Sequence, residues 1–117
     1  MSIQRIAKPW GYELLWAHTA QYAGKILAIR RGCQLSLQLH EHKEESMYLL
    51  SGALEVELEG EDGRTACHQM RPGETIDVPG RRRHRLRALT ACRVLEVSTP
   101  ELDDIVRLED DYGRAPA

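Results

Sequence analysis

The chain has 117 residues, of which 42% are hydrophobic and 29% charged, and its formal net charge is −2. This length suits one domain over residues 1–117, and the near-neutral charge gives no reason to expect nucleic acid or an anionic membrane as a partner. No segment approaches the ~20 apolar residues of a membrane span, and the three cysteines lack CxxC spacing, so we expect a soluble cytoplasmic protein with reduced thiols.

Glycine and proline recur at short intervals along the chain and separate segments of four to eight residues. This rhythm predicts an all-β barrel or sandwich rather than helices. The expected strands cover residues 13–17, 25–30, 35–40, 47–50, 54–59, 65–70, 75–78, 84–88 and 93–98. We expect a core barrel at about 24–99, with the N-terminal segment and the C-terminal tail packed on it. The tail at 102–108 fits either a helical turn or an extended arm.

The segment 35–40 alternates strictly, with leucine at every odd position and Ser36, Gln38 and His40 at the even positions. Side chains two residues apart share a face of a strand. If the polar face lines the barrel, the leucine face points outward and needs a cover. We therefore predict a homodimer.

Potential metal ligands cluster after this strand. His40, His42 and Glu45 lie within six residues, and His84 follows about forty residues later. Imidazole and carboxylate together suit a divalent Zn, Fe, Mn, Ni or Co ion. Either Gln38 and His40, or His40 and His42, could direct their side chains at one ion, because each pair is two residues apart on a strand.

The wider spacing resembles the two motifs of the cupin family. The first motif runs Gly, five residues, His, one residue, His, three or four residues, Glu, six residues, Gly. The chain fits this frame if Gln takes the first His position, with the five motif residues at Gly32, Gln38, His40, Glu45 and Gly52. The resemblance therefore implies a double-stranded β-helix (jelly-roll) barrel and a metal held by Gln38, His40 and Glu45, and it leaves His42 as the alternative ligand near the mouth.

The second motif runs Gly, five residues, Pro, one residue, Gly, two residues, His, and three residues later Asn. Gly73 and Pro79 keep this spacing, and His84 stands at the His position as the fourth metal ligand. Arg81 replaces the motif's Gly and Ala88 replaces its Asn. We expect the neighbouring Gly80 to supply the backbone freedom of the turn.

The flanking segments narrow the resemblance. KPWGYE at 8–13, LSLQLH at 35–40 and DDIVRLEDDYGR at 103–114 are similar to the cupin domain of type II mannose-6-phosphate isomerases. This resemblance implies isomerisation of a phosphorylated sugar, in which a metal stabilises an ene-diolate and a base moves a proton between C1 and C2. The candidates for that base are His42, Glu45 and Glu41.

A sugar phosphate as ligand would need cationic partners, and the arginine-rich run 81–87 is the obvious source. Arg82 and Arg83 in the turn are the candidates for phosphate binding, and Tyr48 is a candidate for the pocket wall. An alternative stays open, because the same arginines could pair with the acidic tail instead.

Three functions therefore remain in competition. The first is a metal-dependent sugar-phosphate isomerase. The second is a dioxygenase-type cupin, since a mixed His, Glu and Gln shell with open positions can bind O2. The third is a cupin that binds a small ligand without catalysis.

Overall fold

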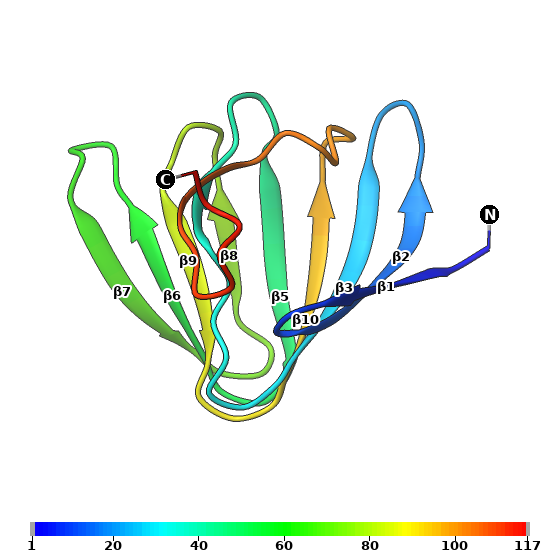
Figure 1. Ribbon diagram of the computed structural model, residues 1–117, viewed down its shortest axis with the longest axis horizontal. Coiled ribbons are helices and arrows are strands. Elements are labelled where there is room, and N and C mark those ends of the chain that lie inside the picture. The colour runs from blue at the N-terminus through cyan, green and yellow to red at the C-terminus, as the bar shows by residue number, and fades with distance from the viewer. Residues whose placement is uncertain (1, 117) are drawn as a thin grey trace.

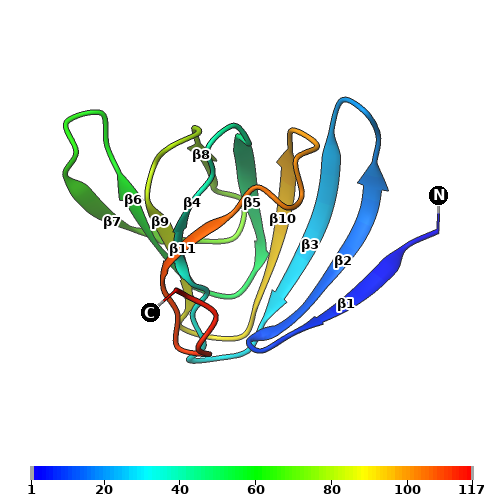
Figure 2. The same cartoon turned by 45° about the horizontal axis from the view of Figure 1, so that its top comes forward.

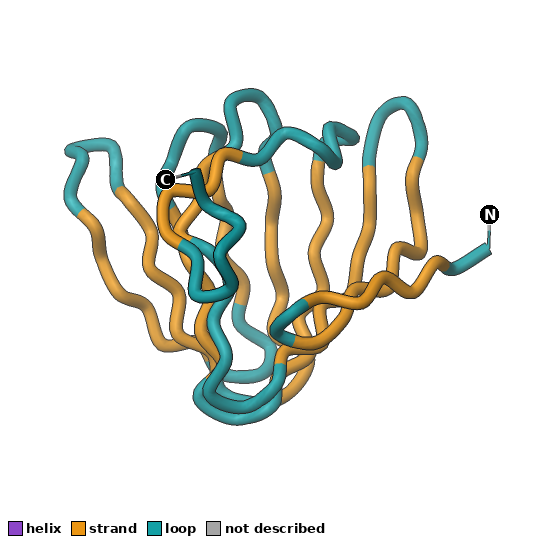
Figure 3. Tube along the Cα trace, in the orientation of Figure 1, coloured by secondary structure: helices purple, strands orange, loops and turns teal. Residues whose placement is uncertain are grey.

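The structure is a computed structural model that describes residues 2–116, and it consists of strands and connecting loops (Figures 1 and 3). The strands are β1 (Gln4–Lys8), β2 (Gly11–His18), β3 (Ala23–Ile29), β4 (Leu37–Leu39), β5 (Glu45–Ser51), β6 (Leu54–Glu59), β7 (Thr65–Met70), β8 (Thr75–Val78), β9 (His84–Ala88), β10 (Cys92–Ser98) and β11 (Val106–Glu109). Residues 2–116 contain no helix long and apolar enough to cross a membrane.

The strands form two antiparallel sheets. One sheet has the order β1-β2-β3-β10-β5-β8, and the other has the order β11-β4-β9-β6-β7. The two sheets enclose a barrel that narrows at one end and opens between loops at the other (Figures 1 and 2). The all-β prediction is confirmed, and the expected strands 54–59, 65–70, 75–78 and 84–88 have the predicted bounds.

The core lies inside the barrel, between the two sheets. Alternate residues of both sheets point inward, as the period of a half-buried strand requires. Apart from Ser36, the largest fully buried side chains are aliphatic or Met. The cluster consists of Trp10, Leu27, Ile29, Met47, Leu49, Leu54, Val56, Met70, Val78, Leu86, Ala88, Cys92 and Val94. A chain without Phe therefore builds its core from Leu, Val and Met.

The tail after residue 100 is an extended arm rather than a helical turn. Its strand β11 pairs with β4 at the edge of the five-stranded sheet, with Arg107 opposite Gln38. Figure 2 shows this segment running beside β4. A further strand, β1, pairs with β2 at the edge of the other sheet. The sequence did not predict β1, because its residues are mostly exposed and do not alternate.

The outward leucine stripe predicted at 35–40 is wrong for Leu35. Only Leu37–Leu39 forms a strand, and Leu35 packs against the core. The backbone is irregular here, because the Leu35 N–H donates to the Leu86 carbonyl and the Arg85 Nε–H donates to the Leu35 carbonyl. The regular two-residue period therefore begins only at Leu37, and the homodimer stays a prediction.

The turn before β9 also departs from expectation. Arg81, not Gly80, has the positive φ, at 64°. Left-handed backbone is uncommon for residues other than Gly. The Arg81 N–H donates to the carbonyl of His40 at 2.6 Å, so the strained residue ties the turn before β9 to the end of β4.

Candidate metal centre

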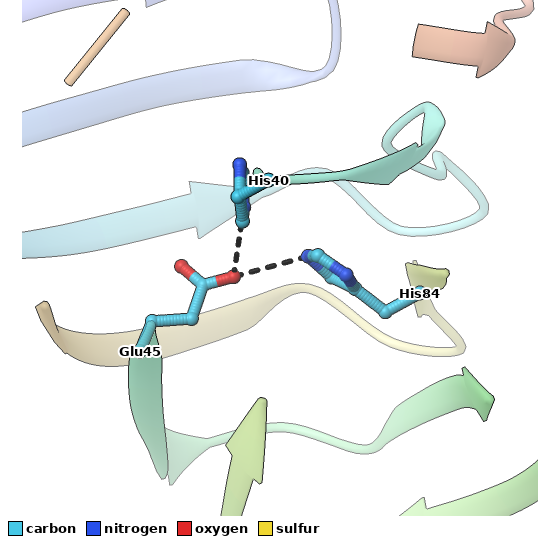
Figure 4. Close-up of side chains that lie close together, drawn as sticks. All are labelled: His40, Glu45 and His84. Atoms are coloured by element: carbon cyan, nitrogen blue, oxygen red, sulfur yellow. Dashed lines mark hydrogen bonds and ion pairs between the residues drawn. The ribbon is translucent and has the colours of Figure 1, made fainter. Parts of the chain in front are cut away.

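Three buried side chains meet at the open end of the barrel. His40 lies just after β4, Glu45 begins β5 and His84 begins β9. The ligand atoms of this group all lie within 4.8 Å of one another. Figure 4 shows both imidazole rings directed at one carboxylate oxygen, Glu45 Oε1, which lies 3.2 Å from His40 Nε2 and 3.0 Å from His84 Nε2. Each side chain is only 3% exposed.

The outer hydrogen bonds of the two rings fix which nitrogen faces inward. His40 Nδ1 lies 2.5 Å from the Asp104 carbonyl, and His84 Nδ1 lies 2.9 Å from the Arg82 carbonyl. A carbonyl only accepts, so each Nδ1 carries the proton. In a neutral ring Nε2 then presents a lone pair to the carboxylate. Three lone pairs that converge without protons require a cation, and this donor set fits a divalent metal.

Gln38 lies beside this group. It pairs with His84 across β4 and β9, and it lines a void of about 10 Å³ together with Glu45 and His84. Its Oε1 accepts a hydrogen bond from the Ser36 hydroxyl at 2.6 Å. The His42 side chain is exposed in the loop between β4 and β5, so the structure places Gln38, rather than His42, next to the three buried side chains.

Asp104 from the tail holds the loop that carries the centre. Its carboxylate accepts hydrogen bonds from the backbone N–H groups of Glu41, His42 and Lys43, at 2.9, 2.7 and 2.9 Å. These bonds lower the pKa of Asp104 to about 2. Since its carbonyl also accepts from His40, one tail residue orients both the loop and the His40 ring.

Lys43 lies between two buried carboxyls. Its Nζ is 3.3 Å from Glu45 Oε2 and 3.6 Å from Glu96 Oε2. Burial opposes a charge on Lys43, but Glu96 and Glu45 raise its pKa above the ordinary value. Burial also opposes a charge on Glu45, yet its contacts with the His40 and His84 rings and the nearby charge of Lys43 hold the pKa of Glu45 well below its usual range. Burial and the Glu45 charge raise the pKa of Glu96 well above its ordinary value, so the pKa values of the two carboxyls are shifted in opposite directions.

A cavity of about 90 Å³ opens next to His40 and Gln38. Its wall contains five cationic side chains from β1, β3, the loop before β5 and the tail, against the carboxyls of Glu13 and Glu96. The cations are Lys8, Lys25, Lys43, Arg107 and Arg114. The buried Arg107 Nε has no hydrogen-bond partner among the described residues, and an unpartnered buried donor is costly unless a ligand or water satisfies it.

The residues that the sequence proposed for substrate binding lie outside this cavity. Arg82 donates to the Glu59 carbonyl at 3.4 Å and lies 3.9 Å from Glu61, while the Arg83 side chain is exposed. Tyr48 is 41% exposed on the face of β5 opposite to Glu45. In the run 81–87, Arg85 is the arginine that pairs with a tail carboxylate, Glu109, at 3.4 Å.

Of the candidates for a proton-moving base, Glu41 and His42 have exposed side chains, and Glu45 belongs to the buried group. Sequence reasoning missed Lys43, Glu96, Asp104 and the cations of the cavity. The sequence could have indicated Glu96, because it lies two residues after the core residue Val94 in the same strand and therefore faces the same side.

Comparisons with known proteins show the family to which the chain belongs. The family model described as mannose-6-phosphate isomerase C-terminal matches residues 2–110. Curated relatives include mannose-1-phosphate guanylyltransferase ManC of Salmonella typhimurium, 31% identical over 95% of this chain and 23% of the relative. Another is xanthan biosynthesis protein XanB of Xanthomonas campestris, 29% identical over 95% of this chain and 24% of the relative. The chain thus spans about a quarter of the length of these relatives.

Solved structures support the fold independently. KdgF from Halomonas sp. superposes with a TM-score of 0.75 and 27% identity, covering 89% of this chain and 92% of KdgF. Oxalate decarboxylase from Bacillus subtilis superposes with a TM-score of 0.83 and 18% identity, over 97% of this chain and 32% of the decarboxylase. Another matching structure of that decarboxylase comes from a study of its Mn(II) centres. The chain is therefore a cupin and belongs to the mannose-6-phosphate isomerase C-terminal family.

Proposed function

We propose that this cupin binds one divalent metal through His40, Glu45 and His84, with Gln38 as the fourth ligand, and isomerises a phosphorylated sugar of the mannose 6-phosphate type. The observation that carries the proposal is the cationic cavity beside the metal ligands, with its unpartnered Arg107 Nε. Guanidinium and ammonium groups that converge on a small cavity favour a phosphate or carboxylate.

We assign different roles to different residues of the cavity. Arg107, with Lys8, Lys25 and Arg114, holds the phosphate, while Gln38 and His40 in the same wall bring the sugar oxygens to the metal. A bound divalent ion would act as a Lewis acid on those oxygens. Glu96 is the buried carboxyl of the cavity next to Lys43, and we assign it the transfer of the proton between the two carbons.

A direct test compares mannose 6-phosphate with mannose, using protein loaded with each candidate metal in turn. We expect the phosphate ester to bind at least about tenfold more tightly than mannose, since one charge-assisted contact contributes ~1.5–3 kcal/mol. A coupled assay for fructose 6-phosphate should show turnover. Binding without turnover under every metal would refute the isomerase and leave the small-ligand-binding function, and oxygen uptake with Fe would favour the dioxygenase.

Two variants locate the phosphate site. Arg107→Gln should remove most of the preference for the ester, because it deletes a donor inside the cavity. Arg82→Gln is the matched control, since Arg82 lies outside the cavity and contacts Glu59 and Glu61. If Arg82→Gln lost the preference and Arg107→Gln kept it, the phosphate site would lie at the turn before β9 instead.

A further inference from the structure

The tail contains a tight turn that is closed by an ion pair between Asp110 and Arg114. Asp110 Oδ2 accepts hydrogen bonds from the Arg114 backbone N–H at 2.7 Å and from its Nε at 2.8 Å, and Oδ1 accepts one from its Nη2 at 3.0 Å. Gly113 has a φ of 75°, which favours glycine and lets the chain turn back after β11 (Figure 2). One carboxylate therefore holds both the backbone and the side chain of Arg114.

The surroundings of this turn keep the pair in place. The Asp110 side chain is 0% exposed, and burying a carboxylate is costly unless it is paired. The hydrogen bonds from Arg114 lower the pKa of Asp110, and the same bonds raise the pKa of Arg114, so both groups are charged at neutral pH. Beside them the Tyr112 ring packs against the core, and the Asp111 carboxylate accepts hydrogen bonds from Gln34 at 3.0 and 3.2 Å. The Arg114 guanidinium thus has a defined orientation.

That orientation leaves one side of the guanidinium free. A guanidinium donates from a planar fork of N–H groups, and Asp110 occupies the side formed by Nε and Nη2. The remaining N–H groups, on Nη1 and Nη2, point away from the carboxylate. Because Arg114 lines the cavity of about 90 Å³ beside His40 and Gln38, these N–H groups are the donors that a ligand there can reach.

Arg107 lies in the wall of the same cavity. Its buried Nε has no hydrogen-bond partner in residues 2–116, and burial together with the charge of Arg114 lowers the pKa of Arg107. The two guanidinium groups are therefore close enough to repel each other. An anion that accepts hydrogen bonds from both removes this repulsion and satisfies the unpartnered donor.

We propose that Asp110 is a positioning residue, which orients Arg114 so that its free side and the Arg107 Nε bind one phosphate group together. Asp110 itself does not line the cavity and acts through Arg114. This role rests on the phosphate site of the proposed function, but it requires neither turnover nor a particular metal. Two oriented guanidinium groups suit a phosphate, because its oxygens can accept hydrogen bonds from both at once.

Charge and orientation predict opposite effects for Asp110→Asn. The substitution removes a negative charge close to the cavity, so the change in charge alone should strengthen the binding of an anion. If Asp110 orients Arg114, the dissociation constant of mannose 6-phosphate should instead rise about tenfold, because a charge-assisted contact becomes misaligned. Isothermal titration calorimetry on metal-loaded protein measures this change, and the affinity for mannose should stay within about threefold. Unchanged or tighter binding of the ester would refute the role of Asp110.

Asp111→Asn is the matched control. Asp111 is exposed and lies outside the cavity wall, and the substitution removes the same charge from the same turn. Its dissociation constant for mannose 6-phosphate should stay within about threefold of that of the unaltered protein. An equal loss in Asp111→Asn and Asp110→Asn would show that the whole turn, rather than the orientation of Arg114, determines the affinity.

A double-mutant cycle tests whether Asp110 acts through Arg114. Arg114→Lys keeps the positive charge and loses the planar fork, so it should also weaken the binding of mannose 6-phosphate about tenfold. Adding Asp110→Asn to Arg114→Lys should change the affinity by less than about threefold, since the oriented group is already lost. Losses that multiply to about 100-fold would show that Asp110 does not act through Arg114. Unchanged affinity in Arg114→Lys would show the same, even if Asp110→Asn fails to fold.

The phosphate site and the role of Asp110 can fail separately. If the unaltered protein shows no preference for mannose 6-phosphate over mannose, the phosphate site is refuted, and the role of Asp110 with it. If the preference survives in Asp110→Asn, only the role of Asp110 is refuted. Circular dichroism of each variant confirms that the barrel is folded.

Discussion

The two ends of the barrel interior are built from the same strands and have opposite chemistry. In β5 the inward residue at the open end is Glu45, and four residues later it is Leu49. In β9 the change is from His84 to Ala88. The closed, narrow end is apolar, whereas the open end holds buried charges that are stable only with partners or an ion. Each of these strands thus has a residue for the core at one end and a candidate metal ligand at the other. Mutations at the two ends should therefore affect the free energy of unfolding and the metal affinity separately.

The largest effect is expected at the closed end. Leu54 is fully buried, and Leu54→Ala should lower the free energy of unfolding by ~2–5 kcal/mol through lost transfer energy and the cavity left behind. Urea unfolding measures this loss. The metal affinity of the folded variant should stay within about threefold of the unaltered protein, and a large loss of affinity would show that the two ends are not separable.

At the open end we expect mutations to reduce metal affinity more than stability. His40→Ala and His84→Ala should each reduce metal affinity on the order of 100-fold or more, since even an outer-sphere partner typically contributes ~10–100-fold. Competition with a chelator of known affinity measures this change. His42→Ala is the control, because its side chain is exposed, and it should cost less than about threefold. A larger loss in His42→Ala than in His84→Ala would show that the alternative ligand set is correct.

A smaller effect is expected at the tail. Asp104→Asn keeps one acceptor oxygen and removes the charge that three backbone N–H groups surround. We expect metal affinity to fall about tenfold, at the lower end for residues that orient a ligand. Asp103→Asn, one residue away and exposed, should leave the affinity unchanged. Equal affinities for the two variants would mean that the tail does not orient His40.

The smallest effect is expected in the pH dependence of stability that Asp104 contributes. The pKa of Asp104 is lowered to about 2 in the folded state, against about 3.9 in an unfolded chain. Its ionised form therefore stabilises the fold above about pH 4, and that contribution disappears as the pH falls through about 2. Melting temperatures of the metal-free protein should drop over this interval, and the drop should be shallower in Asp104→Asn.

The sequence predicted most of the strands and three members of the buried group. Alternation is a local property, so regular strands such as 54–59 could be delimited from sequence. Motif spacing placed His40, Glu45 and His84 together, because these residues sit at strand ends that the barrel brings close. Both successes depend on short-range pattern or on a spacing that the fold family constrains.

The environment of the centre could not be predicted in the same way. Lys43 and Glu96 face each other only because β10 pairs with β5, and Arg107 reaches Gln38 only because the tail pairs with β4. Such contacts depend on register between distant segments. The left-handed Arg81 was missed for a related reason, since its conformation follows from a hydrogen bond to His40 rather than from its own preference.

The attachment of the tail should set the rate of metal exchange. β11 is a four-residue edge strand that pairs only with the three-residue β4, and short edge segments are among the first to open by local unfolding. Because Asp104, two residues before β11, secures the loop and the ring of His40, each opening of the tail would loosen a ligand. Metal exchange should then proceed at the rate at which the tail opens, and hydrogen exchange at the amides of residues 41–43 should report that same rate.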